Sequence, residues 1–223
     1  MSIRASASRN RGTPPGRTAY RLSFVREVHR LLAAGYARLK KPATLASKEE
    51  TEITGLLVDG MRDAIEGPKR LAWTSRYAVH DDRPISQGTR QGRARARIDI
   101  EVERTMPGPH PRFQFEAKRM YRGDSVSEYV SAEGLGAFLD GTYASTCAAA
   151  GMLAYVQTNG TNSWAKKVET KLDSDRTAHL LAAGPKVWER VDLYDARKLS
   201  SYQTTHARTP EALDVFHTFL RCY

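Results

Sequence analysis

The sequence has few cysteines and lacks the motifs that define several common enzyme classes. Its only cysteines, Cys147 and Cys222, do not form a Cys-x-x-Cys pair, and its six histidines are scattered. This pattern indicates neither a disulfide framework nor a structural zinc site. Gly-x-Ser-x-Gly, P-loop, Gly-x-Gly-x-x-Gly and His-Glu-x-x-His motifs are also missing. Their absence counts against serine hydrolases, nucleotide-driven motors, dinucleotide enzymes and zinc proteases.

Long apolar runs are missing as well. The sequence has no stretch of about 18 apolar residues, the length that a membrane-spanning helix needs. Its N-terminus lacks the apolar core of a signal peptide. The most apolar stretch, residues 136–156, is interrupted by Asp140 and by many small residues. We therefore expect a soluble, cytoplasmic protein that does not associate with membranes.

Basic residues, in contrast, are abundant. Lys and Arg number 35 against 25 Asp and Glu, which gives a formal net charge of +10. Such an excess favours a polyanionic partner, because each cation that meets a phosphate releases a counterion. Hydrophobic residues make up 40% of the 223-residue chain and charged residues 27%, a balance that can fill the core of one domain.

The basic excess begins at the N-terminus. Residues 1–17 are rich in Ser, Arg, Pro and Gly, contain no acid, and include Arg4, Arg9, Arg11 and Arg17. We interpret residues 1–19 as a flexible basic arm and residues 20–223 as a single domain. The arm is either a non-specific tether to phosphates or a tail without a role.

Two helices are expected before the first strand. Residues 20–41 place one apolar stripe on a helix that Pro42 ends: Leu22, Val25, Val28, Leu31 and Leu32. A second helix is expected to start at Ser47, where Ser47 and Glu50 match the capping-box spacing. Its apolar face would contain Ile53, Leu56, Leu57, Met61, Ala64 and Ile65 before Gly67-Pro68 stops it.

An antiparallel hairpin is the clearest pattern in the chain. In residues 95–103, Ile98, Ile100 and Val102 alternate with polar residues that include Asp99, Glu101 and Glu103. In residues 112–119, Phe113, Phe115 and Ala117 alternate with Gln114, Glu116 and Lys118. The segment rich in Pro and Gly between them predicts the turn.

The other elements follow from similar signals. Residues 71–80 read as β-structure, 81–91 as a loop, 125–150 as mostly helix and 152–157 as a short buried strand opened by Gly151. Asn159-Gly160 predicts a turn and residues 163–172 a helix with exposed lysines. Residues 187–194 and 198–206 predict late strands, and 212–223 fits a helix or a strand. Together, the predicted helices and strands indicate an α/β domain with a central mixed β-sheet flanked by helices.

The hairpin brings chemistry-bearing residues together. Side chains two residues apart in a strand point to the same face, so Glu116 and Lys118 lie side by side on the polar face. Pairing of the two predicted strands can bring Asp99 next to Glu116. Two converging carboxylates suit Mg²⁺ or Mn²⁺. A neighbouring ammonium can hold or help deprotonate a water and can stabilise charge on a phosphate.

The helix before the hairpin offers a further acid. Glu49 and Glu50 lie in its first turn near the apolar face, and Glu50 has the better spacing to Ile53 and Leu57. Glu50 is therefore the preferred candidate, with Glu49 as the alternative.

This arrangement resembles the PD-(D/E)XK nuclease superfamily, the restriction-endonuclease-like fold. The matching residues are Glu50 on the helix, Ile98-Asp99 on one strand and Glu116-Ala117-Lys118 on the next. The helix-strand-strand-strand-helix-strand order of residues 47–157, about half of the chain, is similar to the family's common core. Ile98 stands where the motif has proline, a position that often varies in the family.

The resemblance implies a role for each residue. Asp99 and Glu116 would bind the metal with the backbone carbonyl of Ala117, Lys118 would position and activate the attacking water, and Glu50 would complete the site or bind a second metal. The activity implied is Mg²⁺-dependent endonucleolytic hydrolysis of phosphodiester bonds, in DNA rather than RNA, as in restriction or anti-phage defence. Asp99→Ala and Glu116→Ala would then abolish turnover and leave the fold largely intact.

Several other charged residues and histidines have either a functional or a structural role. Arg95, Arg97 and Arg119, with Arg93 and Arg122, could clamp phosphates or be solvated strand ends. Glu101 and Glu103 are expected to pair with arginines, and His206 and His217 to be satisfied structural groups. The alternatives to a stand-alone or homodimeric nuclease are a non-catalytic nucleic-acid-binding module and a nuclease subunit of a larger defence complex.

Overall fold

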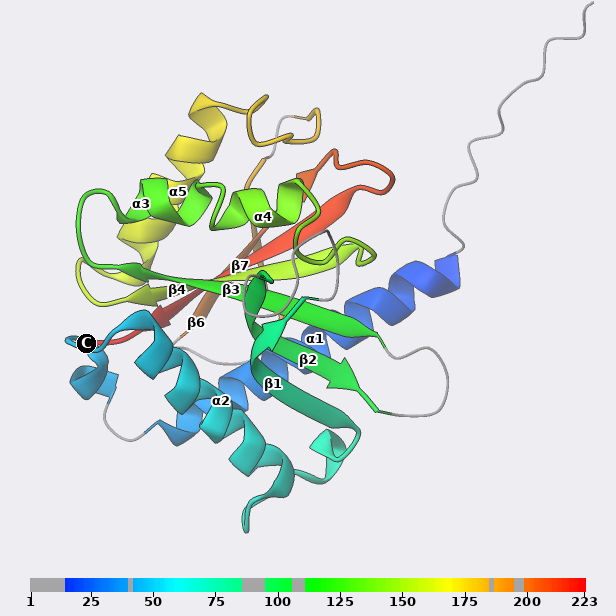
Figure 1. Ribbon diagram of the computed structural model, residues 1–223, viewed down its shortest axis with the longest axis vertical. Helices are drawn as coiled ribbons and strands as arrows, with labels where there is room; N and C mark the ends of the chain where they lie inside the picture. Colours follow the sequence, from blue (N-terminus) through cyan, green and yellow to red (C-terminus); the bar gives the residue numbers. More distant parts are fainter. Residues whose placement is uncertain (1–14, 40–41, 86–94, 106–110, 185–186, 195–198) are drawn as a thin grey trace, which may run out of the picture.

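The computed structural model describes residues 15–39, 42–85, 95–105, 111–184, 187–194 and 199–223. They form a seven-stranded mixed sheet in the order β1-β2-β3-β4-β7-β6-β5, with helices on both faces (Figure 1). The predicted class, α/β with a central mixed sheet flanked by helices, is confirmed.

The strands divide into a meander, a parallel centre and a second antiparallel edge. The pairs β1–β2, β2–β3, β7–β6 and β6–β5 are antiparallel, whereas β3–β4 and β4–β7 are parallel. The bounds are β1 Tyr77–Pro84, β2 Arg97–Arg104, β3 Arg112–Met120, β4 Ala149–Val156, β5 Glu189–Val191, β6 Leu199–His206 and β7 Leu213–Arg221. The predicted β2–β3 hairpin is therefore confirmed.

The helices form two layers around the sheet. Helices α1 (Pro15–Arg38) and α2 (Glu50–Glu66) cover one face, and α3 (Ser125–Val130), α4 (Leu135–Leu139) and α5 (Thr161–Ser174) cover the other (Figure 1). Two short 3-10 helices, Pro42–Leu45 and Ala72–Thr74, flank α2. Each layer has its own core cluster, so both faces of β3 and β4 are buried. Among the described helices, none is both long enough and apolar enough to cross a membrane.

Several predicted helix boundaries differ from the structure. Helix α1 begins at Pro15, so residues 15–19 of the predicted arm are helical, and residues 1–14 lie outside the described residues. Helix α2 begins at Glu50 and not at Ser47, and the backbone N–H of Glu49 donates to the Glu52 carboxylate at 3.0 Å. The predicted Ser47–Glu50 capping box is therefore wrong by two residues. Leu22 and Leu56, expected on apolar stripes, are exposed.

Strand and helix predictions after α2 also need correction. Residues 81–84 extend β1 instead of forming a loop, residues 125–150 contain two short helices and the start of β4, and the strand predicted at 187–194 is only β5. The buried strand predicted at 152–157 begins earlier, at Ala149. The Asn159-Gly160 turn and helix α5 with its exposed lysines are confirmed. Residues 212–223 form a strand, β7.

Two glycines allow α1 and α2 to cross closely. A Cβ on Gly60 of α2 would lie 2.5 Å from the carbonyl oxygen of Gly35 in α1. Real Cβ atoms do not approach backbone this closely, so the helices would have to separate. Gly55 lies in the same helix, and a Cβ there would meet nothing within 4 Å.

Alanine at these two positions should therefore change stability in opposite directions. We expect Gly60→Ala to lower the free energy of unfolding by about 2 kcal/mol through overpacking. The matched variant Gly55→Ala should raise it by up to about 1 kcal/mol, because alanine is the better helix former. Urea denaturation measures both. A Gly60→Ala variant as stable as Gly55→Ala would contradict this close helix crossing.

His29 of α1 is a buried polar group in an aromatic environment. Its Nδ1 donates to the Val25 carbonyl at 2.8 Å, and its ring meets Phe113, Phe115 and Phe216 edge-on. Among the described residues, its Nε2 has no hydrogen-bond partner. Burial lowers the pKa of His29 to about 4, so the folded protein holds the ring neutral.

This lowered pKa makes stability depend on pH. Above pH 6.5 the ring is neutral in both states, whereas below it the unfolded chain takes up the proton first and stability falls as the pH approaches 4. Between pH 7 and pH 5 His29 should cost about 2 kcal/mol. We expect His29→Leu to remove that part of the decline when urea midpoints of both proteins are compared. Parallel pH profiles for parent and variant would exclude a neutral buried ring.

Candidate functional site

The pairing of β2 with β3 stops in the middle of β3. The antiparallel register runs from Glu103 opposite Arg112 to Ile100 opposite Phe115. The next residues in this register are Asp99 and Glu116, and β3 continues to Met120 paired with β4 on its other side. Residues 116–120 therefore form a strand edge that faces away from β4, called here the open edge of β3.

Two acidic side chains accept hydrogen bonds from this open edge. The N–H of Ala117 donates to Asp99 Oδ2 at 2.7 Å, and the N–H of Arg119 donates to Glu50 Oε2 at 3.1 Å. These carboxylates occupy places that a neighbouring strand would fill with carbonyl groups. Because the N–H and C=O of one strand residue point to the same edge, the Ala117 carbonyl is also directed to the open edge.

Lys118 connects the acids of α2 and β3. Its Nζ lies 2.6 Å from Glu116 Oε1 and 3.4 Å from Glu50 Oε1. Glu49, the alternative helix acid, has a side chain that is 67% exposed and forms an ion pair with Arg119 at 2.7 Å. The structure thus brings Glu50, and not Glu49, together with Asp99, Glu116 and Lys118.

Glu116 is the most deeply buried acid of this cluster, at 5% exposure. Its Oε2 has no hydrogen-bond donor within the described part of the chain. Burial, reinforced by the charge of Asp99, raises the pKa of Glu116 to about 8. When protonated, its carboxyl lies within hydrogen-bonding reach of Asp99. Asp99 and Glu116 are therefore neighbouring carboxyl groups at the open edge of β3.

Burial and neighbouring charges also shift the pKa values of the other three groups of the cluster. Burial raises the pKa of Asp99 and of Glu50 despite the opposing effects of the Ala117 N–H and of Lys118. Burial alone would lower the pKa of Lys118, but Glu116 and Glu50 more than offset it and the pKa is raised. If all four groups are ionised, the cluster carries three negative charges and one positive charge.

The donor set fits a hard divalent cation. Asp99, Glu116 and the Ala117 carbonyl provide oxygen ligands at one strand edge, and the donor-free Oε2 of Glu116 is the atom that a cation would satisfy. In the described ranges, no three His, Cys, Asp or Glu side chains are grouped so that they could hold a metal ion. The oxygens of Glu50 are directed to Lys118 and Arg119. Water would have to complete the coordination, as is usual for Mg²⁺.

The arginines considered for phosphate binding are engaged with protein groups. Arg97 Nε donates to Asp82 at 2.5 Å, and Arg119 pairs with Glu49 and lies over the Tyr121 ring at 4.5 Å. Arg95 is half-buried beside the start of β2. Arg93 lies outside the described residues. The structure therefore places Arg95, Arg97 and Arg119 near the strands of the site.

Glu101 and Glu103 pair with arginines, as predicted. Arg83 contacts Glu101 and lies 3.3 Å from Glu103, and Gln114 Nε2 donates to Glu101 at 2.6 Å. Glu101 is buried at 1% exposure, yet both of its oxygens have partners. This distinguishes Glu101 from Glu116, the buried carboxylate with a donor-free oxygen.

The two late histidines are structural, as predicted, and belong to one buried hydrogen-bond chain. His206 Nδ1 must donate to the His179 carbonyl at 2.7 Å, so its Nε2 accepts from Thr204 Oγ1 at 2.7 Å. Thr204 then accepts from His217 Nε2 at 2.8 Å, and His217 Nδ1 accepts from the Tyr129 hydroxyl at 3.0 Å. Burial lowers the pKa of both histidines, which keeps each ring neutral.

Gln157 is a positioning residue that the sequence did not reveal. It follows β4, is buried, and donates from Nε2 to the carbonyls of Leu45 and Lys48 at 2.8 Å each. These bonds fix the segment that leads into α2 and so place Glu50 at the open edge of β3. The available signal was a polar residue at the end of a fully apolar strand.

Comparison with protein-family models, with curated proteins and with solved structures found no match. The resemblance to the PD-(D/E)XK nucleases thus remains a prediction from the motif residues.

Proposed function

We propose that the protein is a metal-dependent nuclease that hydrolyses phosphodiester bonds, with DNA as its substrate. The main support is the buried, donor-free Oε2 of Glu116 beside the carboxyl of Asp99 at the open edge of β3. An ionised oxygen buried without a partner is costly, and carboxylates buried together repel each other. A divalent cation held by these residues would offset both costs.

Each residue of the cluster has a separate role in the proposed reaction. Asp99 and Glu116, with the Ala117 carbonyl, would hold Mg²⁺ or Mn²⁺. The ion would supply Lewis-acid stabilisation of charge on the phosphate. Lys118, which lies between Glu116 and Glu50, would orient the attacking water and stabilise the developing charge. Glu50 positions Lys118 and the Arg119 backbone, so we assign it an orienting role and not that of a second metal site.

Restriction or anti-phage defence is the biological setting that the family resemblance and the size of the chain favour. Positive charge raises the rate of encounter with DNA and strengthens non-specific binding at low salt. A homodimer or a partner protein would be compatible with cleavage of both strands.

The decisive experiment incubates the purified protein with supercoiled plasmid and with single-stranded DNA, in Mg²⁺, in Mn²⁺ and in chelator. Nicking or linearisation that requires the metal supports the proposal. A protein that binds DNA equally well with chelator and never cuts is a binding module. To detect a nuclease that needs a partner, the melting temperature is measured with and without Mn²⁺, because metal bound to the folded state raises it.

A further inference from the structure

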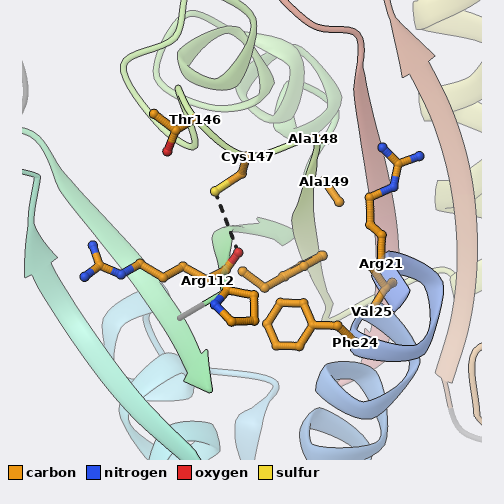
Figure 2. Close-up of a pocket in the computed structure, with 10 residues that line it drawn as sticks. Arg21, Phe24, Val25, Arg112, Thr146, Cys147, Ala148 and Ala149 are labelled. Atoms are coloured by element: carbon orange, nitrogen blue, oxygen red, sulfur yellow. Dashed lines mark hydrogen bonds between the residues drawn. The ribbon is translucent and has the colours of Figure 1, made fainter. Parts of the chain in front are cut away.

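A cavity lies away from the open edge of β3. It has a volume of about 410 Å³ and is bounded by α1, the starts of β3 and β4, and the segment before β4. Figure 2 shows the side chains of Arg21 and Arg112 on opposite sides of it, the Phe24 ring below and Cys147 above. Arg112 is the first residue of β3, and Glu116 lies about 13 Å further along at about 3.3 Å per residue.

The walls of this cavity are apolar. Phe24 and Val25 of α1 and Phe113 of β3 contribute their buried faces, and Ala149 closes the side towards β4. Cys147 is directed towards the Arg112 carbonyl at 3.7 Å, and burial raises the pKa of its thiol, so the thiol is neutral at physiological pH. A hydrocarbon or aromatic group in this space would therefore meet no buried charge.

The rim of the cavity, in contrast, is cationic. Arg21 is fixed by Asp214, whose two oxygens accept from Arg21 at 2.8 Å and from Thr205 at 2.8 Å. A guanidinium has five N–H donors, and this bond uses one of them. Arg21 therefore keeps further donors at the cavity while its position is held.

Arg112 is the more available cation. Its guanidinium lies 3.8 Å from Glu101 and 3.7 Å from Glu103, longer than hydrogen bonds, and its side chain is 48% exposed. Glu101 already accepts from Arg83 and Gln114. Arg112 can thus turn to an incoming anion without leaving a buried carboxylate unsatisfied.

We propose that this cavity binds a small amphipathic anion, a molecule with one apolar or aromatic body and one carboxylate, phosphate or sulfonate group. The body would occupy the space between Phe24, Val25 and Phe113, and the anionic group would bind Arg112 at the rim, with Arg21 adding its positive charge from the opposite side. Guanidinium groups suit planar and tetrahedral oxyanions, and the volume lies in the range of small-molecule sites.

This binding site is separate from the proposed nuclease site and can be tested without DNA. The probe is anilinonaphthalene sulfonate, whose fluorescence rises in an apolar environment, titrated into the purified full chain. We expect one saturable binding site. Arg112→Gln should weaken binding on the order of 10-fold by removing a charge-assisted hydrogen bond. Cys147→Phe should abolish it by filling the cavity.

Controls separate this site from non-specific dye binding. Arg190→Gln, the same change at an exposed position of β5 away from the cavity, should leave the affinity unchanged. Urea denaturation verifies that each variant is folded, and Arg112→Gln still tests the proposal if Cys147→Phe does not fold. Displacement by decanoate or by deoxyadenosine monophosphate distinguishes an aliphatic carboxylate from a nucleotide. Non-saturable fluorescence, or equal affinity in parent and folded Arg112→Gln, would overturn the proposal.

Discussion

Replacing Glu116 by Gln is expected to reduce metal-dependent DNA cleavage on the order of 10³-fold or more. Gln has the same shape, so the packing around β3 is kept. It removes the charge of the buried carboxylate and replaces one ligand oxygen by an NH₂ group, which cannot bind a cation. The amide can donate to Asp99, so the remaining carboxylate is held by a neutral partner and attracts a metal ion less.

The same variant should lose the response of stability to metal. Millimolar Mn²⁺ is expected to raise the melting temperature of the parent protein and to leave that of Glu116→Gln unchanged. Glu101→Gln is the matched control, because Glu101 is also a buried glutamate of the hairpin but is satisfied by Arg83 and Gln114. It should retain cleavage and the metal response. A folded Glu116→Gln protein that cuts as fast as the parent would rule out the proposed site.

The predictions from the sequence were most accurate where apolar and polar residues alternate strictly along a strand with a buried face. The alternation of Ile100 and Val102 with Asp99 and Glu101 identified β2 and its orientation, because a shift by one residue would have turned both apolar side chains away from the core under α1 and α2. Ile98, predicted on the same face, packs instead in the cluster on the other face of the sheet. The same pattern in β3 put Glu116 next to Lys118. Three of the four site residues thus came from a local rule.

Boundaries were missed where tertiary contacts outweighed local signals. Ser47 looks like a helix cap, but Gln157 binds the carbonyls of Leu45 and Lys48 and keeps that segment outside α2. Helix α2 therefore starts at Glu50, which places the Glu50 carboxylate on the open edge of β3. This long-range contact spans more than 100 residues and no local pattern contains it.

Polar or glycine-rich segments were misread for other reasons. Residues 81–84 look like a loop because β1 is an edge strand, where polar side chains and a terminal Pro84 are tolerated. Residues 125–150 contain Gly134, Gly136 and Gly141, which divide the expected helix into α3, α4 and a turn. The composition of residues 81–84 does not show that they lie in an edge strand. The composition of residues 125–150 does not show where the glycines interrupt the helix.

Lys118→Met is expected to separate catalysis from metal binding. Methionine keeps the length of the apolar stem and removes the ammonium that lies 2.6 Å from Glu116 and 3.4 Å from Glu50. The loss of a group that orients water and stabilises charge should lower the cleavage rate about 10²- to 10⁴-fold. The carboxylates of Asp99 and Glu116 remain, and without the competing cation they should attract a divalent ion at least as strongly.

Lys118→Met is therefore expected to cleave slowly but to keep or strengthen metal binding. Glu116→Gln is expected to lose both cleavage and metal binding. Cleavage under single-turnover conditions gives the rate, and the dependence of the melting temperature on Mn²⁺ concentration gives the affinity. Lys48→Met is the matched control, since Lys48 also pairs with a glutamate, Glu52 at 2.9 Å, but on the outside of α2. If Lys118→Met lowers metal affinity as much as Glu116→Gln does, the ammonium holds the carboxylates in place and does not act on the water. The proposed division of work between Lys118 and the two metal-binding acids would then have to be abandoned.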